Sequence, residues 1–232
     1  MISTLQKNSE LTSRNNPFCF MRIILVHGFN ASPSMNFHPW LRDELHAAGF
    51  EVIAPELPLK SAPRVPGDTS DPQLAEGIDM PAIMEVMKKE IGYLKNEDIL
   101  LGHSLGALVI LQYLEAVEMT ETPRAVILVG APWKVARPEL RRLFVDDLDA
   151  DVLMWKAREY VVIHSADDQL VPIEHGKKLA EQLRARLIET ATDGHYMGTQ
   201  YPILKETILE IARTPFDYAP GESLPDAYQH MA

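Results

Sequence analysis

The sequence predicts a single α/β domain in three layers, with a mainly parallel six-stranded sheet and helices on both faces. Strand-like and helix-like segments alternate from residue 22 to residue 213. Such alternation implies right-handed crossovers, which cover a parallel sheet on both sides. The chain has 232 residues, of which 46% are hydrophobic and 24% are charged. That size and composition suit one domain with a sizeable core.

The expected strands are short apolar runs at Arg22–Val26, Glu51–Ala54, Ile99–Leu101, Ala125–Val129, Tyr160–His164 and Arg186–Glu189. The expected helices cover Phe37–Ala48, Pro81–Lys95, Leu105–Val117, Ile173–Ala185 and Pro202–Arg213. Pro81 and Pro202 suit the first turn of a helix, where the missing N–H is harmless. Gly49 follows the first helix as an expected stop signal. Parallel strands place ligands beyond their carboxyl ends, which is where we expect a site.

Three regions are expected along the chain: a flexible leader at 1–21, the α/β domain at 22–213 and an irregular tail at 214–232. The leader is polar and aperiodic. Met21 stands directly before the first strand, so the sequence leaves open whether Met21 is the natural start and the leader an upstream extension. Segments 57–80 and 131–157 interrupt the alternation after strands, which makes them candidates for the rim of a site. A short helix is expected around Pro138–Leu148.

Composition argues against several classes of partner. The formal net charge of −11 repels nucleic-acid backbones and acidic membrane surfaces, so neither is expected as a partner. No apolar run approaches the ~20 residues that span a bilayer, and no secretory signal is visible at the N-terminus. The single cysteine, Cys19, rules out an intrachain disulfide and favours the cytoplasm. The histidines lack zinc-site spacing, so no metal or other cofactor is expected.

The most informative motif is Gly102-His-Ser-Leu-Gly106, which lies between an expected buried strand and an expected buried helix. A serine at such a strand-to-helix turn is typical of the nucleophile of a serine hydrolase. The turn is so tight that the positions two before and two after the serine must lack side-chain bulk. The pattern therefore indicates Ser104 as a catalytic nucleophile.

A serine hydroxyl needs a neighbouring base, which is normally histidine. His195 is the best candidate, because it follows the last expected strand and a glycine, and precedes the last helix. His46, His175 and His230 are interpreted as surface residues. A carboxylate must orient the base, and the strand ending at His164 is followed by both Asp167 and Asp168. From the residues alone Asp168 is favoured and Asp167 stays open, since either could instead cap a helix or form a turn.

Two aimed N–H groups must stabilise the oxyanion that forms during attack. We expect the N–H of Leu105, at the start of the helix after Ser104, and the N–H of Phe29, in the turn after the first strand. His27 is interpreted as a residue that fixes this turn through hydrogen bonds, and His103 as a residue of the serine turn. The candidates for the substrate rim are His27, Asn30, His103, Trp133 and Trp155.

From Met21 to about Arg213 the chain resembles the α/β-hydrolase superfamily, and within it the small serine hydrolases related to retinoblastoma-binding protein nine. The matching pieces are Arg22-Ile-Ile-Leu-Val-His-Gly-Phe-Asn, Phe37-His-Pro-Trp-Leu, Gly49-Phe50, Gly102-His-Ser-Leu-Gly, Asp168-Gln-Leu-Val-Pro and Gly194-His195. The resemblance implies a triad of Ser104, Asp168 and His195, no large cap domain and hydrolysis of carboxylic esters or aminoacyl amides. Segment 57–80 is longer than the family loop, and the tail has no counterpart in the family.

Two classes of function follow. The first is a serine hydrolase that needs no cofactor or metal and cleaves a small ester, with an amide as the rival substrate, through an acyl-enzyme on Ser104. The second is a protein-interaction module on a hydrolase scaffold with little or no activity. The presence of every residue that catalysis needs favours the first. The sequence does not decide the natural substrate, the oligomeric state or whether segment 57–80 acts as a lid.

Overall fold

The computed structural model describes residues 18, 21–62, 79–118, 121–135, 140, 143–144 and 148–215. Six strands form one sheet: β1 Arg22–Val26, β2 Glu51–Ile53, β3 Ile99–His103, β4 Ala125–Val129, β5 Glu159–Ser165 and β6 Arg186–Thr190. Their order is β2-β1-β3-β4-β5-β6, and every neighbouring pair is parallel. The predicted six-stranded parallel sheet is confirmed, and the carboxyl ends of its strands share one edge.

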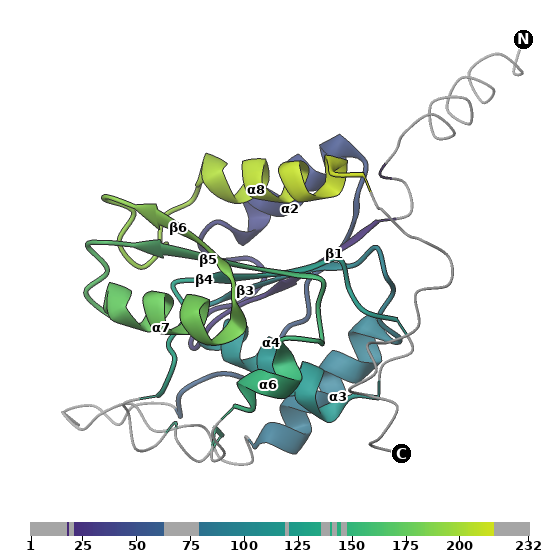
Figure 1. The fold of residues 1–232 in the computed structure, drawn as a ribbon, viewed down its shortest axis with the longest axis horizontal. Helices are drawn as coiled ribbons and strands as arrows, with labels where there is room; N and C mark the ends of the chain where they lie inside the picture. The colour runs from purple at the N-terminus through teal and green to yellow at the C-terminus, as the bar shows by residue number, and fades with distance from the viewer. Residues whose placement is uncertain are drawn as a thin grey trace, which may run out of the picture.

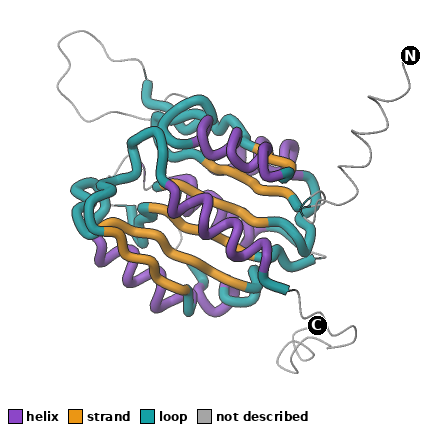
Figure 2. The backbone as a smooth tube through the Cα atoms, turned by 90° about the horizontal axis from the view of Figure 1, so that it is seen from above, coloured by secondary structure: helices purple, strands orange, loops and turns teal. Residues whose placement is uncertain are grey.

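The helices are α2 His38–Ala48, α3 Met80–Ile91, α4 Leu105–Ala116, α6 Ala150–Leu153, α7 Ile173–Leu183 and α8 Pro202–Arg213. Helices α2 and α8 cover one face of the sheet, and α3, α4, α6 and α7 cover the other (Figure 1). The view turned by 90° shows the strands running between these two helical layers (Figure 2). This is the three-layer arrangement that the alternation predicts.

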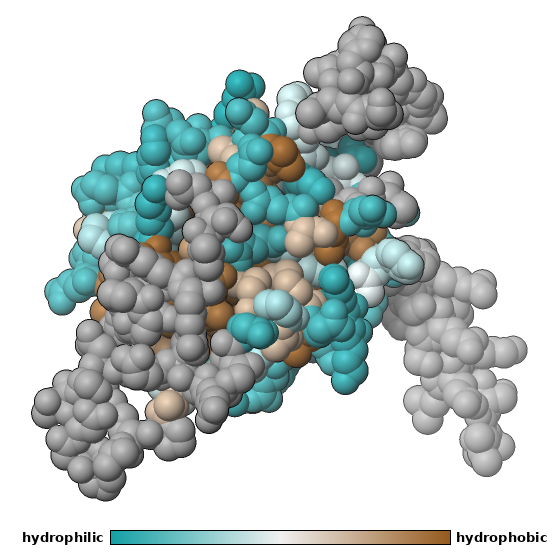
Figure 3. All heavy atoms as spheres, turned by 90° about the horizontal axis from the view of Figure 1, so that it is seen from below, coloured by the Kyte–Doolittle hydropathy of each residue, from teal (hydrophilic) through white to brown (hydrophobic). Residues whose placement is uncertain are grey.

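The sheet is apolar on both faces because each face contributes to a separate core. Along β1, Ile24 and Val26 pack into the core beneath α3 and α4, whereas Ile23 and Leu25 pack into the core beneath α2 and α8. Strands buried on both faces read as continuous apolar runs, as β1 and β4 do. On the face shown in Figure 3 the described surface is largely hydrophilic, with apolar side chains in smaller groups.

Backbone conformation explains where helices end earlier than expected. Helix α3 ends at Ile91 because Gly92 has a φ of 65°, and α7 ends at Leu183 because Arg184 is left-handed with a φ of 50°. Strand β3 extends two residues further than expected, to His103, through its pairing with β4. Helix α6 was not expected, and most of the short helix predicted around 138–148 lies outside the described residues, as do 63–78 of the 57–80 segment.

The two ends of the domain are only partly described, as residues 1–17, 19–20 and 216–232 lie outside the described ranges. Phe18 stacks on Phe50 with ring centroids 4.6 Å apart, and the carbonyl of Met21 accepts a hydrogen bond from the N–H of Glu51. Near the start of β1, the buried Arg22 guanidinium donates to both carboxylate oxygens of Asp98. Within the described part of the chain, no helix has the length and apolar character needed to cross a membrane.

Candidate active site

Ser104 occupies the turn between β3 and α4 in a strained backbone conformation, with a φ of 54° and a ψ of −124°. Its N–H donates to the carbonyl of Val129 at 2.9 Å, which ties the turn to β4. A Cβ added at Gly102 would overlap the backbone of Ala107, and one at Gly106 would overlap the carbonyls of Val26 and His27. The turn therefore requires glycine at both positions, as the sequence pattern predicts.

The loop after β1 lies directly against Ser104. A Cβ added at Gly28 would be 3.0 Å from the Cβ of Ser104, which is tighter than ordinary packing. Phe29 follows Gly28 and Leu105 follows Ser104, and both line the same pocket as the serine. These are the two residues whose N–H groups were expected to face a developing oxyanion.

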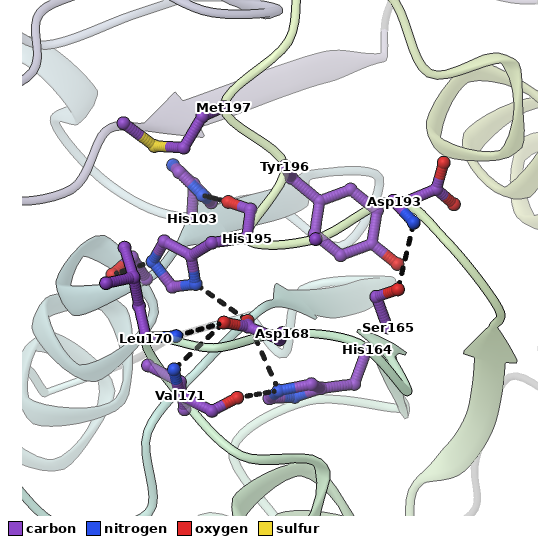
Figure 4. A network of polar contacts seen from close by, with 12 residues as sticks. His103, His164, Ser165, Asp168, Leu170, Val171, Asp193, His195, Tyr196 and Met197 are labelled. Carbon is purple, nitrogen blue, oxygen red and sulfur yellow. Dashed lines mark hydrogen bonds and ion pairs between the residues drawn. The ribbon is translucent and has the colours of Figure 1, made fainter.

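His195 contacts both Ser104 and Asp168. Its Nε2 is 2.9 Å from the Oγ of Ser104, and its Nδ1 is 2.7 Å from the Oδ2 of Asp168 (Figure 4). A carboxylate can only accept, so Nδ1 carries the proton and Nε2 is left to accept the serine O–H. The loop that presents His195 has left-handed residues on either side, Gly194 with a φ of 55° and Tyr196 with a φ of 54°.

Asp168 is buried, with 6% of its surface exposed, and is fully hydrogen-bonded. Its Oδ1 accepts the N–H groups of Leu170 and Val171, each at 2.9 Å, while Oδ2 accepts from His195. Burial pushes the pKa of this carboxyl upward, but the bonds from His195 and from the two N–H groups outweigh it. The pKa of Asp168 therefore lies below its ordinary value, and the group is a carboxylate at neutral pH.

Asp167, the alternative candidate for the acid, points elsewhere and is exposed. Its Oδ1 accepts the hydroxyl of Ser165 at 2.6 Å and the N–H of Gly194 at 2.8 Å. Asp167 thus connects the turn after β5 to the loop that carries His195, without contacting the imidazole. The structure places Asp168 against His195 and gives Asp167 a bracing position.

Two further buried histidines flank this group. The Nε2 of His103 lies 2.9 Å from the backbone carbonyl of His195, so it donates there. Burial lowers the pKa of His103 to about 3, so the ring is neutral. The Nε2 of His164 lies 2.8 Å from the carbonyl of Val171 and 3.5 Å from the Oδ2 of Asp168.

A pocket of about 470 Å³ opens above Ser104 and His195. Its walls come from the loop after β1, the segment after β4 and the turn before α7. The apolar lining includes Ala31, Val135, Leu140, Leu170, Val171 and Met197. Polar lining side chains are Asn36, His103, Lys134 and His175. A pocket of this size and character suits a small organic substrate.

Of the five predicted rim residues, His103 lines this pocket, and the structure places the other four elsewhere. His27 is fully buried. Its Nε2 accepts the N–H of Leu57, and its Nδ1 donates to the carbonyl of Gly28. It holds the loop after β1 together, in agreement with its interpretation as a loop-fixing residue. Asn30 is turned away and exchanges hydrogen bonds with Ser61.

The two tryptophans do not reach the pocket either. Trp155 is 50% exposed and lines a separate depression with Arg158 and Leu183, near the amino end of β5. The side chain of Trp133 packs against the core beneath the sheet. Its N–H donates to the Nδ1 of His175 at 3.0 Å. His175, expected on the surface, is therefore half-buried and part of the pocket lining.

Among the described residues, no group of three or more histidine, cysteine, aspartate or glutamate side chains is arranged to hold a metal ion. The chemistry that the described side chains offer is that of an activated hydroxyl. Ser104 donates a hydrogen bond to the imidazole of His195, which in turn donates to a buried carboxylate. This arrangement suits attack on a carbonyl carbon.

Comparison with known proteins shows the family of the chain. A protein-family model described as Serine hydrolase matches residues 23–200. YdeN of Bacillus subtilis (strain 168), which carries a provisional hydrolase name, is 29% identical over 194 residues, covering 81% of this chain and 94% of YdeN. The crystal structure of the B. subtilis ydeN product superposes with a TM-score of 0.69 at 25% identity, covering 82% of this chain and 98% of that chain.

Two more solved structures share the fold. The α/β-superfamily protein XCC1541 from Xanthomonas campestris pv. campestris has a TM-score of 0.59 at 23% identity, covering 84% of this chain and 98% of that chain. Est1E from Butyrivibrio proteoclasticus, solved with ferulic acid bound, has a TM-score of 0.59 at 15% identity, covering 85% of this chain and 89% of that chain. These two structures show the shared fold, while the resemblance inferred from the sequence motifs is confirmed by the family model and the match to YdeN.

Proposed function

The chain belongs to the serine hydrolase family, and on this basis we propose that it hydrolyses a carboxylic ester through an acyl-enzyme on Ser104. The observation that carries the proposal is the continuous contact from the Oγ of Ser104 through His195 to Asp168, with distances of 2.9 Å and 2.7 Å. Hydrogen-bond reach between nucleophile and base, and between base and orienting acid, is the geometric requirement for this chemistry.

The reaction proceeds in two halves. In the first, the Oγ of Ser104 attacks the acyl carbon while its proton passes to the Nε2 of His195. The charge on the imidazole is offset by Asp168, and the carbonyl oxygen accepts from the N–H groups of Phe29 and Leu105. Collapse of the tetrahedral intermediate expels the alcohol, which takes the proton from His195. In the second half, water activated by His195 attacks the acyl-enzyme and releases the acid.

The pocket supports a substrate with an apolar group next to the ester. Val135, Leu140 and Leu170 line its walls, and its volume of about 470 Å³ accommodates an aromatic or medium-length acyl group. Est1E, which shares the fold, is known with the aromatic carboxylic acid ferulic acid bound. An aminoacyl amide is the second substrate candidate, because the same groups would act, although the poorer leaving group demands stricter protonation.

The experiment is active-site labelling combined with a substrate screen. A fluorophosphonate should label the wild-type protein on Ser104, whereas Ser104→Ala should remain unlabelled and lose at least about 10⁴-fold in kcat. Ser34→Ala, which removes an exposed serine hydroxyl, is the matched control and should label normally. Hydrolysis of p-nitrophenyl esters above that of aminoacyl-coumarin amides would support the ester. A folded wild type that neither labels nor hydrolyses would instead support the interaction module.

A further inference from the structure

His164 lies on the opposite side of the Asp168 carboxylate from His195 (Figure 4). It belongs to β5 and is fully buried. The proposed mechanism assigns it no step, and the sequence motifs give it no role. A buried histidine in contact with the acid that orients the base nevertheless influences that acid.

The proton of His164 is on Nε2. This nitrogen is 2.8 Å from the carbonyl oxygen of Val171, which can only accept, so Nε2 must donate. The same nitrogen is 3.5 Å from the Oδ2 of Asp168, which places the N–H dipole beside the carboxylate. His164 thus donates to the carbonyl of Val171, at one end of the turn 168–171, and lies against the carboxylate of Asp168 at the other end.

The other ring nitrogen of His164 has no hydrogen-bond partner, although it is buried. The ring is wedged against α7, where a Cβ added at Gly176 would lie 2.6 Å from that Nδ1. An unpaired buried acceptor is unfavourable for folding, and an apolar side chain of similar shape would avoid the loss. Packing alone therefore does not account for histidine at this position, whereas its N–H, bonded to Val171 beside the Asp168 carboxylate, does.

We propose that His164 is a positioning residue of the active site, whose N–H bond to Val171 fixes the turn that holds Asp168 and whose ring lies against the carboxylate that orients His195. This inference rests on the proposed function. The Oδ1 of Asp168 accepts two backbone N–H groups, one of them from Val171, but Oδ2 has only His195 and the longer contact with His164. Without His164, the only polar side chain beside Oδ2 among the described residues would be His195, the residue that Asp168 orients.

The charge of the surrounding groups determines how the contact between His164 and Asp168 responds to pH. Burial lowers the pKa of His164, so it is a neutral donor near neutral pH. The other titratable groups that interact with His164 or Asp168 are His195, His175, His103, Asp167 and Tyr196. His103 is neutral as well, because burial lowers its pKa to about 3. The carboxylate of Asp168 therefore lies between the neutral imidazole of His164 and that of His195, whose charge changes during the proposed reaction.

The test measures the rate constant of fluorophosphonate labelling against pH for the wild type and for His164→Phe. The phenyl ring keeps the shape of the buried side chain but removes the N–H. We expect the plateau rate to fall about tenfold. We also expect the acid limb to move to higher pH by about half a unit, since a carboxylate with fewer donors holds a protonated imidazole more strongly.

Two further variants separate positioning from structural support. His164→Gln restores an N–H donor and should recover most of the rate and of the wild-type acid limb. Gly176→Ala keeps every polar group but displaces the ring, and should change the rate and the limb in the same direction as His164→Phe. His38→Phe, which replaces another fully buried histidine away from Asp168, is the control and should leave the acid limb in place.

Thermal unfolding shows that each variant is folded before its rate is read. A loss of thermal stability in His164→Phe with an unchanged acid limb and plateau would overturn the inference and leave His164 as packing. That result is distinct from failure of the proposed function, in which the wild type itself would not be labelled on Ser104. If His164→Phe does not fold, the response of Gly176→Ala decides: an unchanged rate and limb would overturn the inference.

Discussion

The turn that carries Ser104 and the turn that carries Asp168 follow strands β3 and β5, on either side of β4, yet they are held in different ways. The serine turn is fixed by backbone contacts: a φ of 54° at Ser104, its N–H bonded to Val129 and no space for a side chain at Gly106. The aspartate turn is fixed by side-chain hydrogen bonds, which Asp168 accepts and His164 donates.

The two kinds of support determine which substitutions each turn tolerates. The serine turn does not tolerate larger side chains at its glycines, because the added atoms would overlap neighbouring main-chain atoms. The aspartate turn does not tolerate loss of the charge on Asp168. Its carboxylate oxygens accept several N–H groups, and a neutral side chain would leave some of these donors unpaired. Steric substitutions should therefore damage the fold at the first turn, and polar substitutions should damage catalysis at the second.

The largest expected effect is at the aspartate turn. Asp168→Asn keeps the side-chain volume but replaces the carboxylate with a neutral amide. The amide does not offset the positive charge that His195 acquires during the reaction, so kcat should fall about 10⁴-fold. The measurement is hydrolysis of a p-nitrophenyl ester, with circular dichroism to verify folding. A variant that retains more than a tenth of the wild-type kcat would mean that Asp168 is not the orienting acid.

The next effect concerns the fold. Gly106→Ala would force a methyl group into the carbonyls of Val26 and His27, and the free energy of unfolding should fall by at least about 4 kcal/mol. Urea unfolding measures this loss. Leu114→Ala, a cavity substitution further along the same buried helix, is the comparison and should cost about 2–5 kcal/mol while leaving Ser104 open to labelling. Normal stability of Gly106→Ala would show that the loop after β1 can move away from α4 to make room for the methyl group.

Acid should destabilise the fold through its buried histidines, among them His103 beside the serine turn and His38 in α2. Burial lowers the pKa of His103 to about 3 and that of His38 to about 4. Below about pH 6.5 the unfolded chain therefore binds protons that the folded chain does not. The free energy of unfolding consequently decreases as the pH is lowered. At pH 5 each histidine should account for about 2 kcal/mol of the loss relative to pH 7.

Urea unfolding at pH 7 and pH 5 measures this loss, and His103→Phe should lose about 2 kcal/mol less than the wild type between the two values. The lowered pKa of Asp168 acts in a different range. Its contribution to stability is present above the ordinary aspartate value and is lost only as the pH falls through the lowered pKa. Equal losses in His103→Phe and the wild type would contradict the assignment to His103.

The smallest effect is expected at Asp167. Asp167→Asn keeps an oxygen that can still accept from Ser165 and Gly194, so kcat should change less than about tenfold. Measured beside Asp168→Asn under the same conditions, it is the matched control for loss of one carboxylate in this turn. A larger loss in Asp167→Asn than in Asp168→Asn would reverse the roles given to the two residues.

The sequence was informative where a residue type is required by local geometry. The Gly102 and Gly106 pattern predicted the serine turn, since no other residue fits between β3, β1 and α4. The alternation of strand-like and helical segments predicted all six strands and the layer arrangement. The signal is strongest in β1 and β4, which are buried throughout and read as continuous apolar runs. Helix ends were less accurate, as at Arg184, where a non-glycine residue adopts the left-handed conformation that ends α7.

The rest of the site depends on contacts between distant segments, which leave no local signal. Trp133 and Trp155 lie in one segment after β4, yet one packs beneath the sheet and the other lies near the amino end of β5. His175 and His164 could be recognised only once α7 was placed against β5. The roles of Ser104, Asp168 and His195 stay predictions until the labelling experiment is done.

The spacing of these residues along the chain has a consequence for biosynthesis. Ser104 and His195 are 91 positions apart, and Asp168 and His195 are 27 apart, so the base is added only after all six strands have been synthesised. A nascent or prematurely terminated chain therefore carries an inert serine. Reactivity towards a fluorophosphonate would consequently report on completed folding, and could be used to follow refolding of this domain in real time.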